Sequence, residues 1–174
     1  MEDDYARIKQ KAYDLAYTYE AERGSCPQAV LSAILETLAI GDPQTIQAAD
    51  GLAGGTALSS EGSCGALVGG MLAIGSVVGR SYKDFSEGKR KRRVFQFAKK
   101  LYDRFEEEYG GPLCKTVQTQ LFGRSYSLIN PQEYEQFEQA GAHVDKCPSV
   151  AGNVARWTIE ILEPLLSDQL QSLK

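Results

Sequence analysis

The sequence predicts an all-α protein, a single compact helical bundle around a buried apolar central helix. Through most of the chain, apolar residues recur at three- and four-residue steps, which is the pattern of amphipathic helices. The alternation of apolar and polar residues that marks half-buried strands is nearly absent. One segment, at about residues 64–78, is apolar on every side, as a helix at the centre of a bundle is expected to be.

The first half of the chain predicts three helices followed by a loop. Helical periodicity runs from Asp4 to Arg23 and again from Pro27 to Ile40, where Gly and Pro end the second segment. A short helix is expected from Pro43 to about Ala49. Residues 50–62 are rich in glycine and serine, so we expect a loop or a broken helix there.

The second half begins with the central helix and continues with further helices. The glycines at 65, 69, 70 and 75 lower the helix stability of the 64–78 segment but allow a neighbour or a cofactor to approach closely. A long amphipathic helix is predicted from Glu87 to Tyr109. Helices are also predicted for Leu113–Leu121, Pro131–Ala140 and Pro148 to about Leu166.

Length and composition indicate one all-α domain that spans residues 1–174, with frayed termini at 1–4 and 167–174. A chain of this length can bury a core without disulfides, and its 43% hydrophobic and 24% charged residues are ordinary for a globular protein. The net charge of −4 argues against nucleic acid as the main partner.

Neither membrane insertion nor secretion is expected. No segment reaches the roughly 18 apolar residues of a membrane span, and the first 20 residues are too charged for a signal peptide. We therefore expect a cytoplasmic protein. In that reducing compartment, a set of cysteines more often binds metal or reacts than forms structural disulfides.

The four cysteines, Cys26, Cys64, Cys114 and Cys147, each lie where a helix is expected to begin. Proline directly follows the first and the last, at a position that it favours at helix starts. A thiol there faces unpaired N–H groups and the positive end of the helix dipole, so we expect its thiolate to be stabilised. Caps normally belong to Ser, Thr, Asp or Asn, so four cysteines at these positions indicate a shared chemical role.

No two cysteines are close in sequence, which excludes the CxxC knuckles of zinc fingers and the clustered runs of ferredoxins. The chain also has no CxxCH motif for covalent haem. Any common site must therefore be assembled by the fold, with helix N-termini converging on one point. Such a convergence would gather positive dipole ends around thiolates or a cluster.

Residues 62–69 (Gly-Ser-Cys-Gly-Ala-Leu-Val-Gly) resemble the CGAxxG signature of a family of redox-active proteins, C_GCAxxG_C_C, named for its cysteine order. Cys26 and the four residues after it resemble the family's first motif, while Cys114 and Cys147 match the later two. The resemblance covers roughly residues 5–160. The family is similar to the non-haem part of split-Soret cytochromes, which implies a cysteine-ligated iron–sulfur centre. The haem motifs of those cytochromes are missing, so haem chemistry is not implied.

Three chemistries remain open. In the first, Cys26, Cys64, Cys114 and Cys147 bind an iron–sulfur cluster or another metal, since four cysteines are a normal ligand set for clusters and for zinc. Gly65 and Gly69 would then open space for the cofactor. In the second, no metal binds and Cys64 is the low-pKa attacking thiol of a thiol/disulfide couple. In the third, the cysteines are packing residues of a non-catalytic helical adaptor.

The first chemistry is the one we expect: a redox-active protein with a four-cysteine site for electron transfer or redox sensing. An iron–sulfur cluster is the expected cofactor, with zinc or no cofactor as alternatives. The expected partner is an oxidoreductase or a transport-system protein, and a homodimer is also open.

Two further features have a plain and a functional interpretation. His143, the only histidine, is either a solvated residue of a polar loop or a fifth ligand or proton donor to a thiolate. The five basic residues at 89–93 would wrap the whole circumference of a helix. They are therefore a solvated helix start or a docking site for an acidic redox partner.

Overall fold

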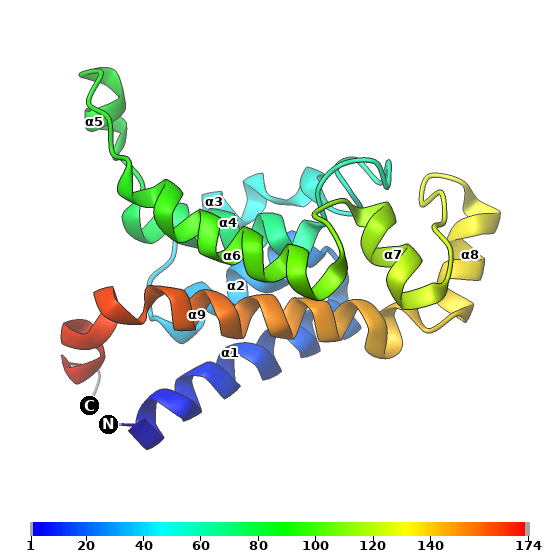
Figure 1. The fold of residues 1–174 in the computed structure, drawn as a ribbon, viewed down its shortest axis with the longest axis horizontal. Coiled ribbons are helices and arrows are strands. Elements are labelled where there is room, and N and C mark those ends of the chain that lie inside the picture. Colours follow the sequence, from blue (N-terminus) through cyan, green and yellow to red (C-terminus); the bar gives the residue numbers. More distant parts are fainter. Residues whose placement is uncertain (1, 173–174) are drawn as a thin grey trace.

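The computed structural model describes the backbone of residues 2–172 and the side chains of residues 4–166. It confirms the predicted fold class, because these residues form an all-α bundle whose one strand-like pairing is an isolated β-bridge between Ser63 and Leu113. Figure 1 shows the longer helices lying along one axis. In chain order the elements are α1 (Glu2–Arg23), α2 (Cys26–Thr37), α3 (Pro43–Ala48), the 3₁₀ turn η1 (Asp50–Leu52), α4 (Gly65–Val78), α5 (Tyr82–Ser86), α6 (Arg93–Tyr109), α7 (Cys114–Phe122), α8 (Pro131–Gln139), the π-helical turn η2 (Ala142–Lys146) and α9 (Cys147–Ser172).

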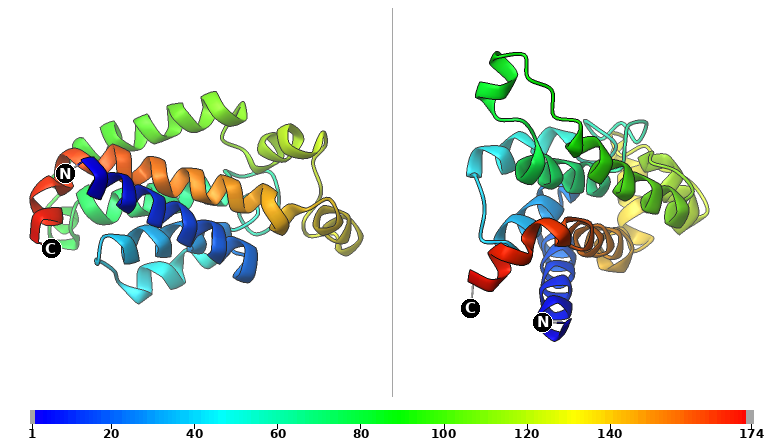
Figure 2. Two further views of the ribbon diagram at one scale, coloured as in Figure 1. Left: turned by 90° about the horizontal axis from the view of Figure 1, so that it is seen from below. Right: turned by 60° about the vertical axis from the view of Figure 1, so that its left-hand side comes forward.

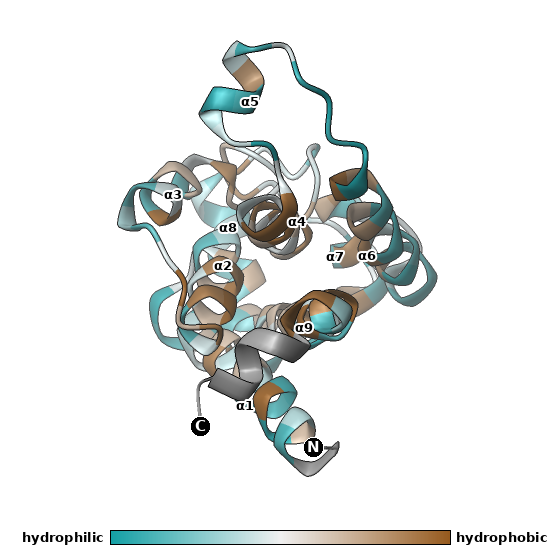
Figure 3. Cartoon of the chain, turned by 90° about the vertical axis from the view of Figure 1, so that its left-hand side faces the viewer, coloured by the Kyte–Doolittle hydropathy of each residue, from teal (hydrophilic) through white to brown (hydrophobic). Residues whose placement is uncertain are grey.

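Helix α4 lies at the centre of the bundle, as predicted. It packs against α2, α6 and α9, while α1 packs along α2 and α9 on the far side. Figure 3, which looks along the long axis, shows the hydrophobic α4 between these neighbours. Its inward face is buried and carries Ala66, Leu67 and Ile74, whereas Met71 and Leu72 on its outer face are half-buried. Only one face of α4 is therefore fully buried in the bundle, although all of its faces carry apolar residues.

Two glycines of α4 let its first two turns lie directly on the start of α2. A Cβ atom on Gly69 would lie 2.6 Å from the carbonyl oxygen of Pro27 and 2.9 Å from Cβ of Val30. A Cβ on Gly65 would lie 2.3 Å from Sγ of Cys26. The close approach predicted from these glycines is thus made by a neighbouring helix, and it brings the starts of α2 and α4 together.

The β-bridge joins the starts of α4 and α7. The N–H of Cys64 donates to the carbonyl oxygen of Pro112 at 2.7 Å, and the N–H of Cys114 donates to that of Gly62 at 2.9 Å. The two segments therefore run antiparallel for one pair of residues before each turns into its helix. This short pairing sets two cysteine-bearing helix starts side by side.

The helix predicted from Glu87 to Tyr109 is shorter than expected, because α6 begins at Arg93. The preceding residues form the short helix α5, which a capping box at Ser81 starts, followed by Gly88 in a left-handed conformation with φ 69°. Residues 89–92 are exposed and non-helical. Consecutive like charges repel one another within a helical turn, which accounts for the late start of α6.

Residues 79–92, including α5, form an arm that projects from one end of the molecule (Figures 1 and 2), while α7 and α8 lie at the opposite end. The arm exposes Tyr82 and Phe85 beside its basic residues. The basic run is therefore exposed, but only its last residue, Arg93, belongs to α6. Lys89 and Lys91 pair with Glu87 and Asp84 of the arm, and docking of an acidic partner stays a prediction.

The frayed ends expected at 1–4 and 167–174 fall partly outside the described residues, namely at Met1 and at 173–174. The backbone of residues 2–4 and 167–172 continues α1 and α9. Across the described part of the chain, every helix is either too short or too polar to span a bilayer.

We predict opposite effects of adding one methyl group at two glycines of α4. Gly69→Ala should destabilise the protein by about 1–3 kcal/mol, because the new Cβ overlaps backbone atoms of α2. Gly75→Ala should stabilise it by about 0.5–1 kcal/mol, because nothing lies within 4 Å of the new Cβ and alanine favours the helix. Urea unfolding measures both changes. Equal effects at the two sites would contradict the close packing of α4 on α2.

Candidate functional site

All four cysteines line one cavity of about 220 Å³. Cys26, Cys114 and Cys147 are the first residues of α2, α7 and α9, and Cys64 directly precedes α4. Three helix starts, and the point where the turn η2 continues directly into α9 at Cys147, therefore lie around one cavity. The convergence was expected from the sequence, but the helical turn before Cys147 was not. All four are free thiols in the structure, with Cys64 and Cys114 buried and the other two partly buried.

Backbone N–H groups interact with two of the sulfur atoms. The N–H groups of Ala66 and Leu67, in the first turn of α4, act to lower the pKa of the Cys64 thiol, although the sulfur forms no capping hydrogen bond. The N–H of Gly54 interacts with the sulfur of Cys26. The arrangement at Cys64 is the one expected for a thiol at a helix start, whereas the N–H group near Cys26 comes from the glycine-rich loop and not from α2.

A buried glutamine holds the third thiol. Nε2 of Gln118 donates a hydrogen bond to Sγ of Cys114 at 3.4 Å, and Oε1 of the same side chain accepts one from the N–H of Tyr126 at 2.6 Å. Because the Tyr126 N–H can only donate, it fixes which end of the amide faces the sulfur. No local sequence pattern predicts this role for Gln118.

The glycine-rich loop after η1 adopts an unusual backbone. Residues 54–58 and Ser60 all have positive φ, and among them Thr56 (φ 65°) is a β-branched residue that rarely adopts this conformation. A Cβ on Gly55 would lie 2.7 Å from Cβ of Cys114, so the loop lies directly on the start of α7. Gly54 and Leu58 line the cavity. Strained backbone of this kind is stored mainly at functional sites.

Burial reverses the expected effect of the helix starts on the thiols. It raises the pKa of the Cys64 thiol to about 12 and the pKa values of Cys26 and Cys147 well above their ordinary range. Burial also raises the pKa of Cys114. The N–H contacts act in the opposite direction but are outweighed, so the prediction of stabilised thiolates is wrong for the cavity as it stands. At neutral pH these cysteines are neutral thiols.

A buried carboxyl group, Glu20 of α1, lies in the cavity wall and was missed in the sequence. Its side chain is 2% exposed, and Oε2 is one of the buried polar atoms without a hydrogen-bond partner among the described residues. Burial, with a contribution from Glu138, raises its pKa to about 8. Its burial could have been predicted from its position in the helix, because Glu20 continues the buried stripe of Ala12 and Ala16 at four-residue steps.

His143 lies between two carboxyl groups and is not the solvated loop residue of the plainer interpretation. Its Nδ1 is 2.6 Å from Oε1 of Glu138, and its Nε2 is 3.6 Å from Oε1 of Glu20. The ring lines the cavity and packs edge-on against Phe137. Whether it acts as a ligand or a proton donor stays a prediction.

The other predicted site residues differ in placement. Gly65 and Gly69 pack against α2 and do not line the cavity. Among the described residues, no three Cys, His, Asp or Glu side chains are grouped closely enough to hold a metal ion. The role of the four cysteines as metal ligands therefore stays a prediction.

The metal-free protein should lose stability as the pH rises from about 4.5 to 8. A carboxyl group whose pKa is higher in the folded than in the unfolded state makes the folded state bind more protons, so unfolding becomes easier through that window. The stability difference between Glu20→Gln and the wild type should grow from near zero at pH 4.5 to roughly 3 kcal/mol at pH 7. Urea unfolding at several pH values measures it, and a difference that does not change with pH would contradict the burial of Glu20.

A comparison with protein-family models matches residues 24–161, a range that includes all four cysteines, to the family described as "Putative redox-active protein (C_GCAxxG_C_C)". No curated protein and no solved structure matches the chain significantly. The GCAxxG motif in the family's description has glycine before cysteine, whereas this chain has Cys64 before Gly65. Since the match covers most of the chain, and the cysteines it spans line one cavity, the protein belongs to the C_GCAxxG_C_C family.

Proposed function

We propose that the protein is a redox protein for electron transfer or redox sensing and that its cavity holds an iron–sulfur cluster. Cys26, Cys64, Cys114 and Cys147 would be the ligands. The observation that carries this proposal is that four thiols from four helix starts line one cavity of about 220 Å³. A bound cluster would supply one-electron redox chemistry, with four cysteines as a normal ligand set.

The charge balance of the cavity favours a cationic occupant. Burial and mutual repulsion disfavour ionisation of the thiols, since Cys64 raises the pKa of Cys26 and Cys114 raises that of Cys64. Among the described residues that line the cavity, the one permanent cation is Arg23, which is exposed and lies over the ring of Tyr19. A metal centre supplies the missing positive charge, because coordination stabilises thiolates outright.

The spacing of the donors favours a cluster over a single zinc ion. Zinc bound to four sulfurs at about 2.3 Å holds them about 3.8 Å apart in a tetrahedron. Among the described residues, no three Cys, His, Asp or Glu side chains are grouped closely enough to hold a single metal ion. A cluster places several metal and sulfide atoms between its cysteines, so it suits thiols that surround a cavity.

The chain's own groups are suited to tune such a centre. Hydrogen bonds to the cysteine sulfurs and exclusion of water are two determinants of the reduction potential of a cluster. Gln118 supplies a hydrogen bond to Cys114, and apolar side chains such as Leu128 and Phe137 contribute to the wall of the cavity.

The two other chemistries are less well supported. An attacking thiol in disulfide exchange needs a substantial thiolate fraction and access to its partner, whereas Cys64 is buried and has a pKa of about 12. A purely structural core would be filled by side chains, whereas here the cysteines surround a cavity that also contains an unpartnered carboxylate oxygen.

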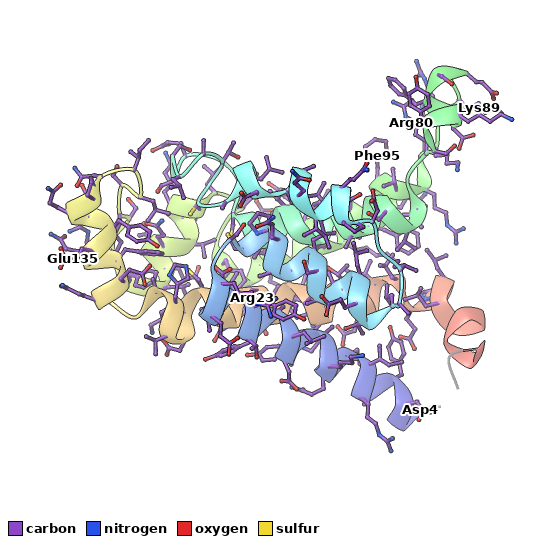
Figure 4. All side chains as sticks on the ribbon, turned by 180° about the vertical axis from the view of Figure 1, so that it is seen from behind. Asp4, Arg23, Arg80, Lys89, Phe95 and Glu135 are labelled. Atoms are coloured by element: carbon purple, nitrogen blue, oxygen red, sulfur yellow. The ribbon has the colours of Figure 1, made fainter. Side chains whose placement is uncertain are left out.

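We propose an oxidoreductase or a transport-system protein as the partner, docking at the end of the molecule that carries α7 and α8. Figure 4 shows Arg80 and Lys89 of the arm at one end and Glu135 of α8 at the other. An acidic partner bound only to the arm would therefore lie far from the cysteine cavity. The cytoplasmic location, the absence of nucleic-acid binding and the homodimer stay predictions.

The proposal predicts a coloured protein after anaerobic purification or after reconstitution with ferrous iron and sulfide. Iron and sulfide should be present in equal, stoichiometric amounts, with broad visible absorption. Each of the four Cys→Ser variants should bind less iron, because each removes one ligand. Gly75→Ala, which alters α4 away from the cavity, serves as the control and should bind as the wild type does. A colourless, metal-free wild type would exclude the proposal, and stoichiometric zinc without colour would favour a single-ion site.

The metal-free protein should react slowly with iodoacetamide at pH 7. A thiol pKa of about 12 leaves little thiolate at Cys64, so alkylation should be at least tenfold slower than in the urea-unfolded chain. Mass spectrometry of the labelled peptides measures each site. Fast labelling of folded Cys64 would instead favour the thiol/disulfide chemistry.

A further inference from the structure

We propose that Glu20 is a fifth donor of the cysteine site, with its Oε2 binding the metal centre directly. The inference rests on the proposed function and adds an oxygen ligand that the cysteine motif does not include. The carboxyl group lies in the wall of the cavity that the four cysteines share, and its side chain is 2% exposed. The site then has four sulfur donors and one oxygen donor.

The unpartnered oxygen is the main evidence. A buried carboxyl group normally has a hydrogen-bond or charged partner, since burial without one is costly. Oε2 of Glu20 has none among the described residues. Carboxylate oxygen is a common metal ligand, so a centre in the cavity supplies the partner that the chain does not.

The charged groups around Glu20 do not replace that partner. On η2, His143 Nε2 lies 3.6 Å from the other oxygen, Oε1, which is beyond hydrogen-bond distance, while its Nδ1 is taken by Glu138 of α8. On α1 itself, the Arg23 guanidinium stacks on the ring of Tyr19. The thiols of Cys26 and Cys147 face Glu20 as further acidic groups, and their pKa values rise because of it.

His143 is a positioning residue in this arrangement. Metal-binding carboxylates are usually held by outer groups, and His143, held by Glu138, lies on the Oε1 side of Glu20 at 3.6 Å. The contact between Glu138 and His143 fixes the ring, and the ring in turn limits the orientation of Glu20. Glu20 can thereby keep Oε2 available to the cavity.

A structural role for Glu20 predicts the opposite result from a ligand role. If the side chain held the fold together, its replacement by glutamine would lower the melting temperature of the metal-free protein. If it is kept for the metal centre, its replacement should raise that temperature, because a buried carboxyl oxygen without a partner is removed. Glu20→Gln should also lower the affinity of the protein for iron.

The test compares the wild type with Glu20→Gln, Glu20→Asp and the matched control Glu22→Gln, which removes an exposed carboxylate from the same helix. Each protein is reconstituted anaerobically with ferrous iron and sulfide and then challenged with a chelator. Iron release is followed in time, the visible and electron paramagnetic resonance spectra are recorded, and the metal-free forms are melted.

We expect Glu20→Gln to release iron about tenfold faster or more, with altered spectra, and to melt at a higher temperature without metal. Glu20→Asp should fall between it and the wild type, and Glu22→Gln should match the wild type.

If Glu20→Gln does not fold, the aspartate variant decides, because a ligand role requires its spectra to differ from those of the wild type. A wild type that takes up no iron and sulfide overturns the proposed function and this inference together. A wild type that takes them up while both Glu20 variants behave identically to it overturns only the role of Glu20.

Discussion

The site depends on one short backbone pairing. The two hydrogen bonds across the Ser63–Leu113 bridge bring the starts of α4 and α7 together, although about fifty residues separate them in the chain. Close packing through Gly65 and Gly69 adds the start of α2 on one side. With the start of α9, these contacts create a cavity that all four cysteines line. Weakening either contact would separate cysteines that no sequence-local motif holds together.

Two opposing electrostatic effects meet at Cys26, Cys64 and Cys114. N–H groups at the helix starts and the amide of Gln118 favour thiolates, whereas removal from water favours neutral thiols. Desolvation wins because the cavity is apolar and its acidic groups, including Glu20, repel one another when ionised. The buried thiols are thus poor nucleophiles, because they stay protonated at neutral pH. The same N–H groups and acidic side chains are well placed once a cationic centre is present.

The molecule separates its two most distinctive surfaces. The arm of residues 79–92 carries exposed aromatic and basic side chains at one end, and the cysteine cavity lies toward the end formed by α7 and α8. A single small contact surface would therefore not cover both the arm and the cavity. The family assignment through residues 24–161 covers both regions but describes only redox activity.

The sequence by itself determined the all-α class and most helix positions. It also placed four cysteines at or next to the first residue of a helix, namely Cys26, Cys64, Cys114 and Cys147. Both follow from local periodicity and capping patterns, which report on local structure. The sequence misplaced the start of α6 because periodicity does not register repulsion among consecutive basic residues. Only the tertiary structure decided that the cysteines share a cavity, that burial outweighs the helix starts, and that Glu20 faces them. Those facts arise from contacts between residues far apart in the chain and from exclusion of water, neither of which a local pattern contains.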